Sequence, residues 1–425
     1  MSETWRGTGQ PMRIVRLANY VGPRSGGMRT ALRELGAGYL AAGHEPVLVV
    51  PGRRRGDEQT AQGRVITRYG PIVPFTGGYR AMLRRRRLAT LLTELRPDRL
   101  EVSDRTTLRW IGRWAREHGV PAVMVSHESL TGLFSLPADV SGMSRWHSRL
   151  LSSMATALAG NLNRRSVRDY QRIVCTTKWA AAEFERIGAP NLTRIPLGVD
   201  LELFSPERYS DAARQRYAAP DQTLLVHCAR LSVEKKPQRA LAALAGLRAD
   251  GTDAVLVMAG DGPLRAQLER AARRRRLPVQ FTGFVTDPKE LATLLASADV
   301  VLAPGPVETF GLAALEALAC GTPVVVSAAS ALPEVVGCAG VAAAGEDFAA
   351  GVRALLDRDP GARRAAARAR AEQFGWPASV AAFLAVHEAL SSVAPGDDPP
   401  IPPKKSSARF VLPGRCKHDA DRYSR

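Results

Sequence analysis

Two glutamates surround the start of a predicted helix and have the chemistry to bind hydroxyl groups. Apolar runs at 298–304 and 323–326 predict buried strands. Between them the chain carries Glu308 in a loop and Glu316 inside a helix, with Thr309 placed to cap that helix. Ligands of parallel α/β sheets bind outside the carboxyl ends of the strands, where helix N-termini offer free N–H groups to phosphate. The stretch therefore predicts a site for a ligand with phosphate and hydroxyl groups.

Either glutamate alone is typical of a solvated surface residue. Glu316 borders the apolar face of its helix, where a carboxylate is costly unless it gains partners such as polyol hydroxyls. Glu308 lies in the loop and can point into a cleft. The two residues together, with Phe310 and Gly311 between them, favour binding over the surface interpretation.

A basic pair follows a predicted strand at 224–230. Arg230 and Lys235 are five residues apart, and they suit a diphosphate, because arginine binds oxygen atoms as a planar fork and lysine as a point charge. Basic loop residues are usually just solvated.

His127 follows the predicted strand 121–126 directly. A lone histidine is usually structural, but at the carboxyl end of a buried parallel strand it becomes a site candidate. Glu128 beside it has the chemistry to position an acceptor hydroxyl, and a solvated loop role is an equal alternative.

The segment from Glu308 to Val324 resembles the E-x7-E segment of retaining glycosyltransferases of family 4. These enzymes have the GT-B fold, an α/β architecture of two Rossmann-like parallel-sheet domains facing across a cleft. The resemblance implies that Glu308 binds hydroxyls of the donor sugar and Glu316 the nucleotide ribose, while N–H groups at the helix start hold the diphosphate. The implied donor-binding set around them is Thr309, Phe310, Gly311 and Leu312.

The spacing Arg-x4-Lys resembles the family pair whose cations neutralise the leaving group. The resemblance makes Arg230, Lys235, Glu308 and His127 the catalytic set, with His127 contacting the donor sugar. Four more residues match donor-side segments of the family: Gly26 and Gly27 before the predicted helix 29–42, Gly260 in a G-x-G-P step, and Phe284 near the base. Two residues, Asp104 and Glu128, match its acceptor side.

The resemblance also divides the 425 residues into parts. We expect a flexible leader (1–11), an N-terminal acceptor-side domain (12–200), a C-terminal nucleotide-sugar-binding domain (201–375), a crossover helix returning to the first domain (376–392) and a disordered tail (393–425).

Composition narrows the class of protein and its compartment. No segment resembles a signal peptide or a spanning helix, and five scattered cysteines without a C-x-x-C pair predict reduced thiols in a cytoplasm. Asp357-Arg358-Asp359 resembles a metal-binding D-x-D only superficially, because it precedes Pro360 rather than following a buried strand. We therefore expect no metal and no cofactor beyond the sugar-nucleotide cosubstrate.

The net charge of +18 would attract anionic partners, which are nucleotide diphosphates, acidic lipid headgroups or nucleic acid, and a GC-rich genome is the alternative explanation for part of the arginine excess. The stretch 77–92 is predicted to be a helix carrying Arg84–Arg87. Its basic side is either a solvated cationic face or a surface that docks peripherally on anionic lipid at the inner face of the cell membrane. Nucleic acid ranks far below, because no aromatic–basic interleaving or recognition helix is evident.

Resemblance to actinobacterial mannosyltransferases favours transfer of a hexosyl unit, best mannose from GDP-mannose, to a lipid-linked or inositol-type polyol acceptor. The alternatives are a UDP-sugar-dependent transferase acting on a soluble acceptor and a sugar-nucleotide sensor without turnover. Retention of the anomeric configuration is implied by the family and not shown by any residue pair. No enzymic nucleophile is evident in the sequence, which fits front-side attack with the leaving phosphate taking the acceptor proton.

Overall fold

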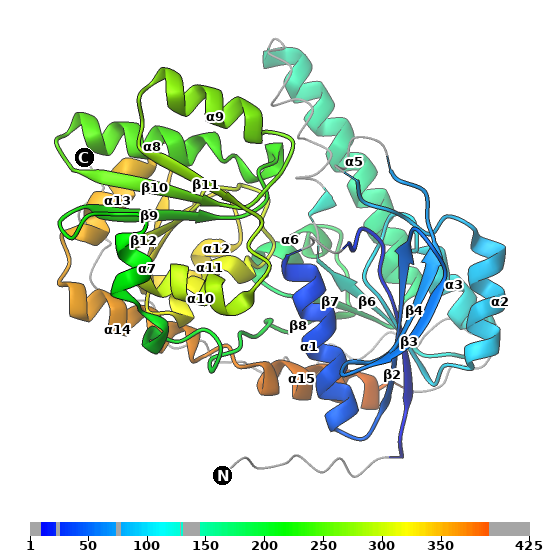
Figure 1. Ribbon diagram of the computed structural model, residues 1–425. Coiled ribbons are helices and arrows are strands. Elements are labelled where there is room, and N and C mark those ends of the chain that lie inside the picture. The colour runs from blue at the N-terminus through cyan, green and yellow to red at the C-terminus, as the bar shows by residue number, and fades with distance from the viewer. Residues whose placement is uncertain (1–9, 23–25, 74–77, 128, 131–144, 391–425) are drawn as a thin grey trace.

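The computed structural model describes residues 10–22, 26–73, 78–127, 129–130 and 145–390, with the side chains of 145–152 left out. The chain forms two α/β lobes, each built on its own sheet (Figure 1). Most of the predicted leader and all of the predicted tail lie outside the described residues. The predicted GT-B architecture is confirmed.

The N-terminal lobe contains an eight-stranded sheet in the order β3-β4-β2-β1-β5-β6-β7-β8, parallel except for the β3–β4 pair. Its central strands are almost fully buried, and most of their buried side chains are apolar, with Arg16 on β1 and Glu101 on β5 as charged exceptions. The elements are β1 (Arg13–Leu17), α1 (Gly27–Ala41), β2 (Glu45–Gly52), β3 (Gly56–Thr60), β4 (Gly63–Tyr69), α2 (Arg85–Leu95), β5 (Arg99–Val102), α3 (Trp110–Glu117), β6 (Ala122–Ser126), α5 (Arg145–Asp169), β7 (Arg172–Cys175), α6 (Lys178–Glu185) and β8 (Leu192–Arg194).

The C-terminal lobe contains a six-stranded parallel sheet in the order β11-β10-β9-β12-β13-β14. Short 3₁₀ turns η1 (Pro206–Arg208), η2 (Val233–Lys235) and η3 (Gly337–Ala339) lie among its elements. These are α7 (Asp211–Gln215), β9 (Thr223–Cys228), α8 (Gln238–Ala249), β10 (Ala254–Ala259), α9 (Arg265–Arg274), β11 (Val279–Gly283), α10 (Pro288–Ser297), β12 (Val300–Ala303), α11 (Leu312–Ala319), β13 (Val324–Ser327), α12 (Leu332–Val336), β14 (Gly340–Ala343), α13 (Phe348–Leu356) and α14 (Pro360–Ala371).

Each sheet has a point where the strand order reverses, between β1 and β5 in the first lobe and between β9 and β12 in the second. In open parallel sheets the crevice at such a point, outside the carboxyl ends of the strands, binds ligands. Arg230 follows β9 and Glu308 follows β12, so both belong to the crevice of the second sheet.

The last described helix, α15 (Trp376–Glu388), returns from the second lobe and packs on α1 of the first (Figure 1). The two helices come very close at Gly38, where an added Cβ would lie only 2.4 Å from the Val380 side chain. Arg99 on β5 donates hydrogen bonds to the carbonyls of His387 and Leu390, at 2.8 and 3.2 Å, and so binds the C-terminal end of α15.

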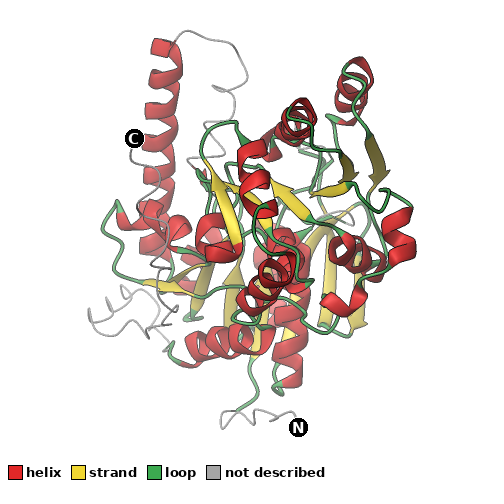
Figure 2. Cartoon of the chain, turned by 90° about the vertical axis from the view of Figure 1, so that its left-hand side faces the viewer, coloured by secondary structure: helices red, strands yellow, loops and turns green. Residues whose placement is uncertain are grey.

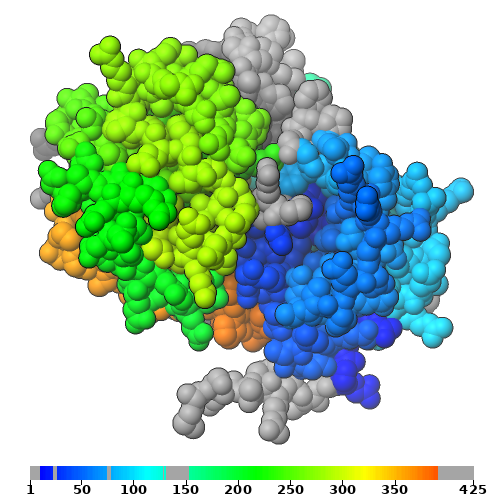
Figure 3. Space-filling view, in the orientation of Figure 1, coloured from blue at the N-terminus to red at the C-terminus, as the bar shows by residue number. Residues whose placement is uncertain are grey.

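The chain crosses between the lobes at two segments that lie side by side. The Val199 N–H donates to the Phe374 carbonyl at 2.8 Å, and Val199 forms a parallel bridge with Gly375. A side chain at Gly198 would lie 2.5 Å from the Trp376 nitrogen. In the space-filling view the two lobes meet along one junction, with α15 at its lower end (Figure 3).

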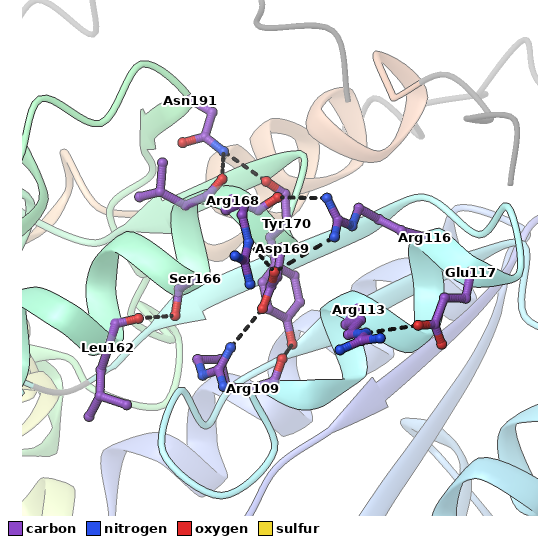
Figure 4. Close-up of polar contacts among 11 residues, drawn as sticks. Arg109, Arg113, Arg116, Glu117, Leu162, Ser166, Arg168, Asp169, Tyr170 and Asn191 are labelled. Atoms are coloured by element: carbon purple, nitrogen blue, oxygen red, sulfur yellow. Dashed lines mark hydrogen bonds and ion pairs between the residues drawn. The ribbon is translucent and has the colours of Figure 1, made fainter. Parts of the chain in front are cut away.

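A buried carboxylate ties α5 to α3. Asp169, at the end of α5, accepts a hydrogen bond from Arg109 at 2.6 Å and one from Arg168 at 3.1 Å, and Arg116 lies 3.9 Å away (Figure 4). These arginines compensate the desolvation of the carboxylate, which is 1% exposed. They secure the base of a long helix that rises well beyond the sheets (Figure 2).

The predicted helix 77–92 is wrong at its start. The chain at Arg80 bridges Ile72, and the Met82 N–H donates to the Asn19 side chain at 2.8 Å, so these backbone groups are already used outside a helix. Helix α2 therefore begins at Arg85. Leu83, an apolar residue of the predicted helix, lies before α2 and is 53% exposed.

Among the described cysteines, Cys175, Cys228 and Cys320 are free thiols, as expected. Cys338 is disulfide-bonded, which contradicts the expectation of reduced thiols throughout.

Candidate active site

An ion pair between Lys235 and Glu308 marks the centre of the second-lobe crevice. Lys235 ends the turn η2 after β9, and Glu308 lies in the loop after β12, so adjacent strands bring them together. Gly305 allows the close approach, because a side chain there would lie 3.3 Å from the backbone of Lys235. The Lys235 ammonium donates a hydrogen bond to Oε1 of Glu308.

Burial lowers the pKa of Lys235, but the charge of Glu308 and its hydrogen bond more than offset this, so the pKa is raised. Lys235 is therefore a fixed cation at neutral pH. A ligand with a diphosphate and a sugar offers each partner a replacement, an anion for Lys235 and hydroxyls for Glu308.

A cavity of about 160 Å³ lies beside this ion pair and between the lobes. It is lined by His127 and Ser129 from the first lobe and by Glu234, Lys235, Val307, Glu308 and Thr309 from the second. Burial lowers the pKa of His127 to about 4, so its imidazole is neutral at pH 7 and has one N–H to donate. The structure thus brings His127, Lys235 and Glu308 to one cavity.

Thr309 connects the lobes instead of capping a helix, which corrects the prediction for this residue. Its hydroxyl donates to the His127 carbonyl at 2.7 Å. Its own carbonyl accepts from the hydroxyls of Thr176 and Thr177 at 3.1 and 2.9 Å. A further bond across the cleft runs from the N–H of Lys178 to Glu334 at 2.8 Å.

Helix α11 begins after Gly311, which has a left-handed φ of 82° and whose side chain, if present, would lie 2.1 Å from Leu332. No side chain caps this helix, so its first N–H groups are not occupied by a cap. Leu312 meets Gly27 of the first lobe, where an added Cβ would lie 3.4 Å away. Phe310 is 3% exposed and packs edge-to-face on Phe374, so its side chain belongs to the core and only its backbone can serve a ligand.

Arg230 does not line the cavity. Its guanidinium lies over the ring of Tyr79, at 4.7 Å from the ring centroid. Tyr79 comes from the first lobe, so this cation–π contact also crosses the cleft. Arg230 is thereby held at the cleft, at the carboxyl end of β9.

Glu316 lies on α11 and is partly buried. Burial raises its pKa to about 7, and the charge of Arg33 on α1 opposes that rise. A half-protonated carboxyl at neutral pH lacks an adequate partner for its charge, and ribose hydroxyls would provide one.

We expect Glu316→Gln to stabilise the unliganded protein at pH 8 but not at pH 4.5. Because the folded pKa, about 7, exceeds the ordinary 4.5, the wild-type free energy of unfolding falls as pH rises from 4.5 to 7 and stays low above it. The shift corresponds to about 3 kcal/mol, which partial exposure reduces to about 1–2 kcal/mol. Urea unfolding at both pH values measures this, and an equal difference between variant and wild type at both would contradict it.

The remaining predicted residues lie in several places. Gly26 precedes α1 and is exposed, and Gly260 follows β10 against the Ala229 carbonyl, which an added Cβ would meet at 2.0 Å. Phe284 follows the edge strand β11 and is 39% exposed, two strands away from β9. Glu128 lies outside the described residues.

Asp104 is not available to an acceptor in this structure. It is 1% exposed, and its carboxylate accepts hydrogen bonds from the backbone and hydroxyl groups of Thr106 and Thr107 and from the Asn19 amide. The residue organises the loop after β5, and its acceptor-side assignment stays a prediction.

Sequence reasoning missed the residues that complete the site from the other lobe. These are Tyr79, Thr176, Thr177, Arg33 and, behind the cavity, Glu183. None belongs to a spaced motif. The only sequence signal was a Thr-Thr pair directly after the apolar residues of β7, which is the position of cleft residues in parallel sheets.

Comparison with known proteins agrees with this geometry. Residues 26–198 match the family described as glycosyl transferase 4-like domain, and residues 210–373 match glycosyl transferases group 1. The chain is 51% identical, over 385 residues, to a GDP-mannose-dependent alpha-(1-6)-phosphatidylinositol dimannoside mannosyltransferase of Mycobacterium tuberculosis (strain ATCC 25177 / H37Ra), covering 89% of this chain and 97% of the relative.

Two solved structures are similar to the whole molecule. Sucrose-phosphate synthase from Thermosynechococcus elongatus gives a TM-score of 0.70 at 20% identity and covers 89% of this chain and 98% of that one. HepE from Anabaena, in complex with UDP and glucose, gives 0.67 at 18% identity, with 89% and 100% covered. At these identities the similarity concerns the fold alone.

Proposed function

Because this chain belongs to the glycosyltransferases of family 4 with the GT-B fold, we propose that its cleft transfers mannose from GDP-mannose to a phosphatidylinositol-type, mannosylated lipid acceptor. The observation that carries the proposal is the 51% identity to a mannosyltransferase whose name states this donor and acceptor class, along nearly the whole chain. The meeting of His127, Lys235 and Glu308 at one cavity supports it.

In the proposed reaction the donor diphosphate lies between Lys235, Arg230 and the N-terminus of α11. These groups bind more strongly as negative charge builds up on the departing phosphate, and that difference lowers the barrier. Glu308 binds the sugar hydroxyls, and the neutral His127 donates a hydrogen bond to the sugar from the other lobe. The lobes exclude water and so limit hydrolysis.

For retention we propose attack from the side of the leaving group. The acceptor oxygen forms its bond to the sugar C1 while the bond from C1 to the phosphate oxygen breaks, and the acceptor proton passes to that phosphate. No protein nucleophile is required, and the cations supply the charge stabilisation, so EDTA should leave turnover unchanged.

Purified protein is tested with GDP-mannose and UDP-sugars, with phosphatidylinositol mannosides or soluble polyols as acceptors. We expect product from GDP-mannose and the lipid acceptor. Product only from a UDP-sugar and a soluble polyol would support the alternative transferase, and binding without turnover would indicate a sensor.

We propose that the first lobe docks on anionic lipid. Three large apolar side chains, Tyr69, Ile72 and Leu83, are 52–56% exposed near the carboxyl end of β4. Exposed arginines adjoin them at Arg84–Arg87 and at 53–55 after β2, which pairs with β4. Arg85–Arg87 occupy the first turn of α2, which has no acidic residue, and the helix dipole disfavours cations there. An anionic surface would compensate this.

Neutralising Arg84–Arg87 to glutamine is expected to weaken sedimentation with phosphatidylinositol-containing vesicles by about 10²–10³-fold, at about 1 kcal/mol per arginine. The matched control is Arg273–Arg276, an equal exposed run at the end of α9, which should bind as the wild type does. Equal binding by the first variant would exclude α2 as the anchor. Within the described residues, every helix is too short or too polar to cross a bilayer.

A further inference from the structure

A second carboxylate lies behind the cavity and touches the segment that carries His127. Glu183, on α6, is 5% exposed. It accepts a hydrogen bond from the Ser129 hydroxyl at 2.6 Å and one from the Leu130 N–H at 3.3 Å. Ser129 itself lines the cavity, together with His127.

Arg105 fixes this carboxylate from the opposite side. Its guanidinium donates to Glu183 at 3.2 Å and to the Asn163 side chain at 2.9 Å, and lies over the ring of Phe184 at 5.0 Å from the centroid. Arg105 is 2% exposed, so neither charge of the pair is free to turn toward water. A buried pair of this kind has one geometry, because breaking it leaves an uncompensated charge.

The wall of the cavity is thus held from two sides. On the donor side, Thr309 donates to the His127 carbonyl. On the far side, Glu183 binds the hydroxyl of Ser129 and the backbone of Leu130. His127 is thus bound to the second lobe through its carbonyl, whereas Ser129 and Leu130 are bound within the first lobe through Glu183.

We propose that Glu183 is a positioning residue for sugar transfer, which holds His127 and Ser129 at the distance the donor sugar requires. This rests on the proposed function, in which the cavity receives the sugar. Glu183 touches no part of the substrate, and it acts through Ser129 and the backbone. Because the nucleotide is bound by the other lobe, a change at Glu183 should affect binding and transfer of the sugar without affecting binding of the nucleotide.

The test is Glu183→Gln, with Glu185→Gln as its control, since Glu185 is an exposed carboxylate on the same helix. We expect Glu183→Gln to lower kcat for mannosyl transfer by about 10–100-fold, the usual effect of a misplaced contact. By calorimetry the Kd for GDP should stay within about twofold, while the Kd for GDP-mannose rises. Glu185→Gln should match the wild type in kcat and in the Kd values for GDP and GDP-mannose.

Ser129→Ala provides a variant that leaves the Arg105–Glu183 pair intact, in case Glu183→Gln fails to fold. Ser129→Ala should likewise raise the Kd for GDP-mannose and leave the Kd for GDP within about twofold. The kcat of the double variant should be no lower than that of Glu183→Gln. The proposal is overturned if Glu183→Gln transfers at the wild-type rate, or if Ser129→Ala weakens GDP and GDP-mannose equally. A wild type that binds no sugar nucleotide would instead refute the proposed function.

Discussion

Lys235→Met is expected to lower kcat for mannosyl transfer by about 10²–10³-fold, the usual effect of removing one group that stabilises charge in a transition state. The ammonium is a cation at neutral pH, since Glu308 raises its pKa, and it lies at the strand-order reversal of the second sheet. In the proposed reaction, the variant has one cation fewer to stabilise negative charge on the departing phosphate. Single-turnover kinetics with saturating GDP-mannose measure the loss without the contribution of product release.

Lys289→Met is the control, because Lys289 is exposed on α10. It should transfer at the wild-type rate. Adding Glu308→Gln to Lys235→Met should cost less than the sum of the two single changes, since the residues form one pair. A Lys235→Met enzyme with unchanged kcat would remove this lysine from the mechanism.

The second large effect concerns stability, at a buried network that joins α15 to the first sheet. Glu101 on β5 accepts hydrogen bonds from Arg16 at 3.1 Å and from the Tyr39 hydroxyl at 3.0 Å, and His387 of α15 lies 3.5 Å away. Burial alone would raise the pKa of Glu101, but the charge of Arg16 and the two other partners lower it to about 2. The wild type therefore retains this stabilisation at every pH above 4.5 and loses it only as pH falls toward 2.

Arg16→Met should cost about 3–5 kcal/mol at pH 7, because it leaves a buried carboxylate without its cation. This corresponds to a fall in Tm on the order of 10 °C. Protonation of Glu101 relieves the cost, so the deficit should be larger at pH 8 than at pH 5. Differential scanning fluorimetry across that range measures both effects.

Arg64→Met is the comparison, since Arg64 pairs with Asp57 on the surface, where both side chains are more than 40% exposed. Such pairs contribute about 0–1 kcal/mol. Equal Tm values for the two variants, or a deficit of Arg16→Met that does not change with pH, would show that the Glu101 charge is not what Arg16 compensates.

The sequence was sufficient to predict the residues that depend on one strand and the loop after it. Lys235 and Glu308 follow neighbouring strands, so any parallel sheet with that order brings them together. The predicted cap at Thr309 was wrong because its hydroxyl, two residues before the N-cap Gly311, donates instead to a carbonyl of the other lobe.

Several other residues around the site could not be predicted, for a physical reason. Tyr79 reaches Arg230 because the two lobes meet, and Glu183 reaches Ser129 because segments 54 residues apart in the sequence come together. No periodicity or local spacing encodes that placement. The hydrogen bonds of Asp104 were equally beyond prediction, since a carboxylate after a strand can be bound by its own loop.

The chain passes between the two lobes at the paired crossing of Val199 and Phe374. Any opening of the cleft would have to break the bonds that span it, among them Thr309 to His127 and Lys178 to Glu334. If the cleft binds its donor as proposed, entry of that donor and release of the spent nucleotide would both depend on how readily these polar links break.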